Sequence, residues 1–146
     1  MSHEYVVTTD KHCFDIPAIH AYLTRSYWSP GIPLSTVQKA IDNSLCFALL
    51  CEREQVGFAR VTTDRATFAY LADVYVLEAH RGRGLAKRLM DAVIQHPDLQ
   101  GLRRFMLATR DAHTLYGQYG FRELASPASI MEIVRPDVYQ SGEVTT

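Results

Sequence analysis

A basic, glycine-containing segment at residues 80–90, HRGRGLAKRLM, has the composition of an anion-binding turn. Four basic residues surround two glycines: Arg81, Gly82, Arg83, Gly84, Lys87 and Arg88. The segment follows a strand-like run and leads into a helix-like one. Amides at the start of a helix lack partners within the helix, and the helix dipole adds positive charge there. The segment therefore predicts a phosphate-binding turn, with an ordinary solvated loop as the alternative.

Composition limits the other ligands. The formal net charge is -1, so no global basic field attracts nucleic acid, and an RNA-binding function is disfavoured. No apolar run approaches the roughly 20 residues of a membrane span, and MSHEYVV does not resemble a signal peptide. Cys13, Cys46 and Cys51 show no CxxC spacing. We therefore expect a cytoplasmic, reducing location, with no metal, nucleic-acid or membrane partner.

The elements that must position the turn follow from sequence periodicity. The length of 146 residues predicts one domain, residues 1–146, ending in a mobile tail at 141–146. Asp15 should cap a first helix, and Ser35 with Gln38 should form a capping box for a second. A third helix should begin at Leu85 and a short fourth one near residue 111. Strands are expected at 4–9, 45–51, 56–63, 67–77, 103–109, 119–124 and 129–136. This order predicts an α+β fold in three layers, with a mixed, mostly antiparallel sheet flanked by helices.

Two motifs in this framework resemble those of the GNAT superfamily of N-acetyltransferases. Residues 81–86, RGRGLA, match the family's acetyl-CoA signature, Q/R-x-x-G-x-G/A. Downstream, DAHTLYGQYGF is similar to the family's A-x-x-L-Y-x-x-x-G-F segment, with Tyr116 in register. The resemblance covers roughly Ala18 to Glu132. It implies a GNAT-like fold, acetyl-CoA as co-substrate and transfer of an acetyl group to a primary amine.

The resemblance also implies how acetyl-CoA would bind. The pyrophosphate would lie on backbone amides of Arg81, Gly82, Arg83, Gly84, Leu85 and Ala86. The pantetheine arm would pair with the backbone of the strand at Val74, Tyr75 and Val76, exposed by a bulge. Thr109 stands where the family often has asparagine, and Glu78 replaces a common proline. Neither change removes a backbone donor from the phosphate turn.

Acetyl transfer needs a neutral amine and an acid that protonates the departing thiolate. The resemblance gives the acid's role to Tyr116, whereas an aromatic core residue is the alternative; Tyr119 could be the packing residue instead. Asp73 is the candidate for binding the amine or accepting its proton through water. A structural aspartate satisfied by amides or by an arginine is the other reading of Asp73. His113 lies near Tyr116 but is disfavoured as a base.

Four aromatic residues are candidate walls of the acceptor site: Tyr27, Trp28, Phe68 and Tyr70. Aromatic walls and one carboxylate would suit a cationic amine, although core packing explains the same residues. The acceptor is a small amine, an amino acid or a protein amine, and these remain open. A homodimer is a further possibility, since dimerisation is common in the family. The rival function is a non-catalytic acyl-CoA-binding regulator or interaction module on the same fold.

Overall fold

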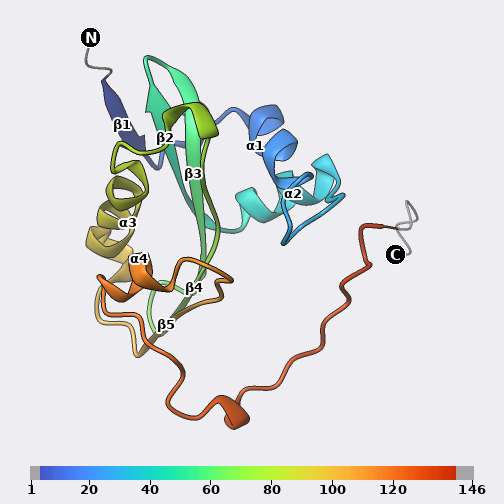
Figure 1. Cartoon of the computed structure of the whole chain (residues 1–146), viewed down its shortest axis with the longest axis vertical. Helices are drawn as coiled ribbons and strands as arrows, with labels where there is room; N and C mark the ends of the chain where they lie inside the picture. The colour runs from blue at the N-terminus through green and yellow to red at the C-terminus, as the bar shows by residue number, and fades with distance from the viewer. Residues whose placement is uncertain (1–3, 141–146) are drawn as a thin grey trace.

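The computed structural model describes residues 4–140 and is built around one five-stranded sheet (Figure 1). The strands lie in chain order, and β4 and β5 are parallel while every other neighbouring pair is antiparallel. Their bounds are β1 Tyr5–Thr8, β2 Leu45–Cys51, β3 Glu54–Thr63, β4 Phe68–Val76 and β5 Arg104–Leu107. The expected α+β architecture with a mixed, mostly antiparallel sheet is confirmed.

Helices cover both faces of the sheet and complete three layers (Figure 1). Helices α1 (Ile16–Leu23) and α2 (Leu34–Asp42) pack on one face, in a core that includes Phe58 and Tyr75. Helix α3 (Leu85–Gln95) packs on the other face through Leu89 and Val93, and α4 (His113–Gly117) contributes Tyr116 to the same core. Three 3-10 turns join these elements, at Lys11–Cys13, Glu78–His80 and Pro97–Leu99, and a fourth, at Pro127–Ser129, follows α4.

The helix starts show where local signals succeed and where they fail. Asp15 caps α1 by accepting from the Ala18 N–H at 3.0 Å, as expected. The predicted capping box of Ser35 and Gln38 is wrong, because α2 already begins at Leu34 with Pro33 as its N-cap. Proline before the first turn fixes the backbone angle that a helix start needs, so a side-chain cap is dispensable there.

The expected strands at 119–124 and 129–136 are also wrong. Within residues 4–140, no strand is assigned after β5, and residues 121–140 form an extended arm that curves away from the sheet (Figure 1). A strand requires a neighbour for its backbone hydrogen bonds, and this arm has no adjacent strand in the single chain. The tail at 141–146 lies outside the described residues.

The length and composition of the helices also bear on membrane association. None of the helices in residues 4–140 combines the length and the apolar character required to cross a bilayer.

Candidate active site

The turn between β4 and α3 presents a helix start that no described side chain caps. Gly84 is the N-cap of α3, and the first turn of this helix contains no acidic residue. The backbone N–H groups of this first turn can therefore donate to an anion, and the helix dipole favours negative charge there. The geometry fits the predicted phosphate turn.

Two glycines keep this turn open. Gly82 and Gly84 have φ values of 81° and 71°, in the left-handed region that glycine enters without strain. An ideal Cβ placed on either residue would meet no other part of the protein within 4 Å. The space beside the backbone is thus available to a ligand, and a side chain introduced there would occupy it. This open cradle fits the diphosphate of acetyl-CoA.

A β-bulge splits β4 just before the turn. Between two successive pairings, β4 advances three residues while β3 advances two, so β4 carries one extra residue. Asp73 lies in this bulge with φ 56°. As a result Leu71 and Tyr75 belong to core clusters on opposite faces of the sheet, although strict alternation would place them on one face.

Beyond the bulge, one edge of β4 is open. The parallel pairing with β5 ends at Leu71. The Leu77 N–H donates to the Val56 carbonyl oxygen at 2.8 Å, so Leu77 directs its backbone toward β3. By alternation, the backbone groups of Val74 and Val76 point to the open side. This is the edge where the resemblance places the pantetheine arm.

The side chains around this edge make contacts within the protein. Arg81 Nε donates to the Val76 carbonyl oxygen at 2.9 Å, and its Nη2 donates to the Tyr22 hydroxyl at 3.1 Å. Arg81 therefore braces the turn, although Arg81 and Arg83 are both exposed. The Tyr75 ring stacks on Tyr22 with 3.8 Å between centroids. Tyr75 is buried in the core, and by the same alternation its backbone faces β3, where it pairs with Phe58, so the prediction that Tyr75 binds the pantetheine arm is not supported here.

The Asp73 carboxylate has two partners. Its Oδ2 accepts from Arg60 Nε at 2.7 Å, and its Oδ1 accepts from Trp28 Nε1 at 2.8 Å. The side chain of Asp73 is only 8% exposed, so the charge is balanced inside the protein by the arginine. This arrangement agrees with the structural reading, in which an arginine satisfies the aspartate.

A cavity of about 390 Å³ lies at the point where β4 and β5 separate. It brings together three of the predicted walls, Tyr27, Trp28 and Tyr70, with Asp73 and Tyr116. Phe68 does not line it: this residue begins β4, at the far end of the strand, and is 38% exposed. We refer to this space as the acceptor cavity.

Sequence reasoning missed two charged residues that line the acceptor cavity. The Arg110 guanidinium lies 3.7 Å from the centroid of the Tyr27 ring, a cation–π contact that covers this wall. Asp111 is exposed, and within residues 4–140 no hydrogen bond or ion pair of its carboxylate is found. Asp111 directly precedes the segment that resembles the family's second motif, and this adjacency was the available signal.

Tyr116 lies between the acceptor cavity and a second cavity, and it lines both. The side chain is buried, and burial is the main cause that raises the pKa of its hydroxyl; the neighbouring Tyr27 and Asp111 add to the shift. The hydroxyl therefore stays protonated at neutral pH. Its position and protonation state suit a proton donor, and its place in the core cluster equally suits a packed aromatic, so the catalytic role stays a prediction.

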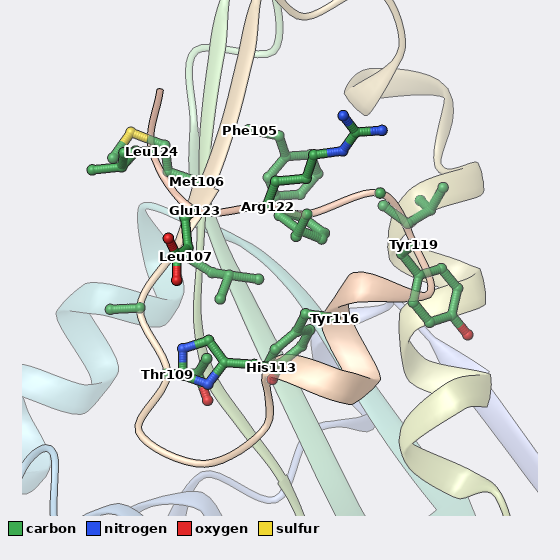
Figure 2. Close-up of a pocket in the computed structure, with 14 residues that line it drawn as sticks. Phe105, Met106, Leu107, Thr109, His113, Tyr116, Tyr119, Arg122, Glu123 and Leu124 are labelled. Atoms are coloured by element: carbon green, nitrogen blue, oxygen red, sulfur yellow. The ribbon is translucent and has the colours of Figure 1, made fainter. Parts of the chain in front are cut away.

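The second cavity, of about 770 Å³, follows β5 and the first residues of the C-terminal arm (Figure 2). Thr109 lines both cavities, and its hydroxyl accepts from the Ala112 N–H at 3.0 Å, so it helps to start α4. His113 faces this second cavity and is absent from the acceptor cavity. Tyr119 donates to Asp91 Oδ1 at 2.8 Å, which ties the end of α4 to α3. This contact agrees with the interpretation of Tyr119 as a packing residue.

Among residues 4–140, no group of three or more histidine, cysteine or acidic side chains is arranged to hold a metal ion. Cys13, Cys46 and Cys51 are all free thiols, and the last two are buried.

Comparison with known protein families identifies relatives of this chain. The model of the acetyltransferase (GNAT) family matches residues 13–121, which include the phosphate turn, the bulge and Tyr116. A protein of Gibberella zeae that carries an acetyltransferase name is 34% identical over 138 residues, covering 79% of this chain and 77% of that protein.

Solved structures agree with the family match. A GNAT-family protein of Xanthomonas campestris is 55% identical and superposes with a TM-score of 0.93, covering 94% of this chain and 98% of that chain. The arm begins at residue 121 of 146. Because the superposition covers 94% of this chain, it includes part of the arm. A protein of Clostridium acetobutylicum, solved with acetyl-CoA, shares the fold with a TM-score of 0.65 at 14% identity, covering 91% of this chain and 96% of that chain.

Proposed function

Because this chain belongs to the acetyltransferase (GNAT) family and is thereby an N-acetyltransferase, we propose that it transfers the acetyl group of acetyl-CoA to a small primary amine by direct attack in a ternary complex. The observation that carries the proposal is the position of Tyr116. One buried phenol lies between the cavity beside the open edge of β4 and the cavity beside β5.

Acetyl-CoA supplies an activated thioester, and the chain supplies its binding surface. The amides at the start of α3 would hold the diphosphate, with Gly82 and Gly84 allowing close approach. The open-side backbone of Val74 would pair with the amide-containing arm, in the manner of an added strand. The Val76 carbonyl already accepts from Arg81, so Val76 would contribute its N–H group alone.

Tyr116 is proposed to protonate the departing thiolate. A group that donates a proton must hold it at the working pH, and burial keeps the pKa of this phenol above its ordinary value. A thiol has a reference pKa of about 8.5, so transfer from a phenol to a free thiolate is uphill by itself. Donation is therefore proposed to occur as the carbon–sulfur bond breaks, when the developing negative charge lies against the hydroxyl.

The amine must lose a proton before it attacks, and two carboxylates line the acceptor cavity. Asp73 is balanced by Arg60 and holds the Trp28 indole, so we assign it the positioning of that wall. We propose that Asp111 binds the ammonium group and accepts its proton. Its carboxylate has no hydrogen-bond or ion-pair partner among the described residues, and its charge contributes to the raised pKa of Tyr116. A water between Asp111 and the amine would carry the proton to solvent.

The lining of the acceptor cavity narrows the class of amine. Aromatic walls and the apolar residues Leu71 and Leu107 surround a volume of about 390 Å³. Two acidic residues line the cavity, and each has a positive charge nearby: Arg110 lines the cavity at the position before Asp111, and Arg60 pairs with Asp73. The lining therefore contains no cluster of uncompensated negative charge that would bind a polycation. We therefore propose a small monoamine with an apolar or aromatic body as the acceptor.

The experiment is a thiol-release assay with acetyl-CoA and a panel of amines. The panel contains arylalkylamines, amino acids, polyamines and peptides with a free N-terminus or lysine, and mass spectrometry identifies the acetylated product. We expect the highest kcat/KM for arylalkylamines. A preference for polyamines or peptides would refute the acceptor class, whereas acetyl-CoA binding without turnover on any amine would favour the non-catalytic regulator.

A further inference from the structure

Two loops meet at the acceptor cavity, and a cation–π pair joins them. Tyr27 lies between α1 and α2, and Arg110 lies between β5 and α4. The central carbon of the Arg110 guanidinium is 3.7 Å from the centroid of the Tyr27 ring, and both side chains line the cavity. The Tyr27 ring also packs edge-to-face on Trp28, with 5.0 Å between ring centroids. The ring therefore holds the guanidinium at the wall of the cavity.

The Arg110 guanidinium is not neutralised by an anion of the protein. Among residues 4–140, no ion pair or hydrogen bond of its side chain is found, and its contact is with the Tyr27 ring. An arginine side chain stays protonated at any pH at which the protein is folded. The wall of the cavity thus carries a permanent positive charge.

The charges of the lining leave room for one ammonium group. Three charged side chains line the cavity: Asp73, Arg110 and Asp111. Asp73 is balanced by Arg60, which lies outside the lining, so Asp111 is the carboxylate left for an ammonium. A second ammonium in a cavity of about 390 Å³ would stay close to the guanidinium. Salt screens charges only beyond about 8 Å in physiological buffer, so their repulsion would persist.

We propose that Arg110, positioned by Tyr27, is a specificity-determining residue that excludes acceptors with a second cationic group. This role rests on the proposed function, because it takes the cavity as the site of the acceptor amine. The face of the Tyr27 ring already holds a cation of the protein itself. The ammonium of the substrate is therefore directed to Asp111, and its apolar body to the remaining walls.

The first test compares two amines with the same carbon chain, hexylamine and hexamethylenediamine, by calorimetry on the protein saturated with CoA. CoA carries no acetyl group, so affinity is measured without turnover, and at pH 7 both ends of the diamine are protonated. We expect the wild type to bind the monoamine more tightly. Arg110→Gln should lower the ratio of the two Kd values by about tenfold. Arg110→Lys keeps the charge and should keep most of this preference, whereas Arg110→Glu should favour the diamine.

Arg104→Gln is the matched control for the loss of one positive charge. Arg104 is exposed on β5 and lines neither cavity, so the ratio of Kd values should not change. Tyr27→Leu should release the guanidinium and lower the ratio, whereas Tyr27→Phe keeps the ring and should keep the ratio. The same ratio in the wild type and Arg110→Gln, an equal change in Arg104→Gln, or no binding of either amine would overturn the role of Arg110.

The thiol-release assay on the same proteins separates this role from acetyl transfer itself. Amines that bind with the expected ratio but release no thiol would refute acetyl transfer and retain the charge selection by Arg110. Acetylation of both amines, with a ratio of kcat/KM values that is the same in the wild type and in Arg110→Gln, would retain acetyl transfer and refute Arg110 as the residue that selects monoamines.

Discussion

Asp73 and Arg60 form an ion pair at the bulge of β4, with 2.7 Å between Asp73 Oδ2 and Arg60 Nε. Arg60 also donates to the Ser44 and Thr62 hydroxyls, at 3.2 Å each. The other carboxylate oxygen of Asp73 holds Trp28, so one side chain connects β3, the bulge and the segment between α1 and α2. This network shapes the acceptor cavity, and it gives the carboxylate a role that needs no proton transfer.

Replacing Asp73 by asparagine should reduce stability without changing the shape of the pH–rate profile. Asparagine tolerates the left-handed φ of this position, but Arg60 would lose its charged partner. We expect the free energy of unfolding to fall by about 1–3 kcal/mol, measured by urea denaturation. After correction for the folded fraction, the kcat/KM of the variant divided by that of the wild type should be constant between pH 6 and about 10.

Asp111→Asn is the matched variant for the same pH series. Asp111 is exposed, so its replacement should leave the free energy of unfolding almost unchanged. The kcat/KM of Asp111→Asn divided by that of the wild type should be lowest near neutral pH, where the amine is protonated. This ratio should rise toward 1 as the pH approaches the amine's pKa of about 10.4. If Asp73→Asn shows the recovering ratio and Asp111→Asn the flat one, the two roles assigned above are reversed.

Replacing Tyr116 by phenylalanine should remove the proton donor and lower kcat by about 10²-fold, with KM for acetyl-CoA little changed. Tyr119→Phe provides the control, since it removes one hydroxyl from the same segment. Tyr119 donates to Asp91 and to the Lys87 carbonyl, so its variant should lose stability and keep its turnover per folded molecule. A Tyr116→Phe protein that is destabilised yet fully active would show that the hydroxyl is structural.

The raised pKa of Tyr116 predicts how activity behaves at alkaline pH. An acid acts only while protonated, so a phenol with an ordinary pKa of about 10 would lose activity as the pH passes that value. Burial moves the pKa of Tyr116 upward, and the midpoint of the loss should therefore lie above the ordinary value. The measurement is kcat at saturating amine up to about pH 10.5, with circular dichroism as the check on folding. A midpoint at or below pH 10 would argue against Tyr116 as the acid.

Replacing Gly84 by valine should abolish tight binding of acetyl-CoA. The new side chain would occupy the open cradle, and a β-branched residue is strained at φ 71°. Gly101→Val is a close control, because Gly101 has the same φ of 71° and no neighbour within 4 Å of an added Cβ, but lies outside the turn. Calorimetry should show at least a tenfold weaker Kd for Gly84→Val and an unchanged Kd for Gly101→Val. Equal affinities in both variants would refute the phosphate assignment.

The features that sequence alone determined are those with local causes. Asp15 followed by Pro17 specifies a helix start, and Gly82 and Gly84 before an amphipathic helix specify an open turn with an uncapped helix start. Tyr116 was located by a short motif, in which spacing along one helix fixes the position of the side chain. The helix start and the glycine turn depend on residues close together in the sequence, so capping chemistry is sufficient for them, whereas Tyr116 was identified through the resemblance to the family's motif.

Tertiary structure decided the features that depend on distant partners. The partners of Asp73 are Arg60 and Trp28, and Trp28 is 45 positions away in the chain, so no local pattern could have predicted this network. Phe68 shares a strand with Tyr70, but only the position of β5 and of the α1–α2 segment determines which of them borders the cavity. The arm at 129–136 has the pattern of a strand and is not one in the single chain, because a strand forms only where another backbone supplies its hydrogen bonds.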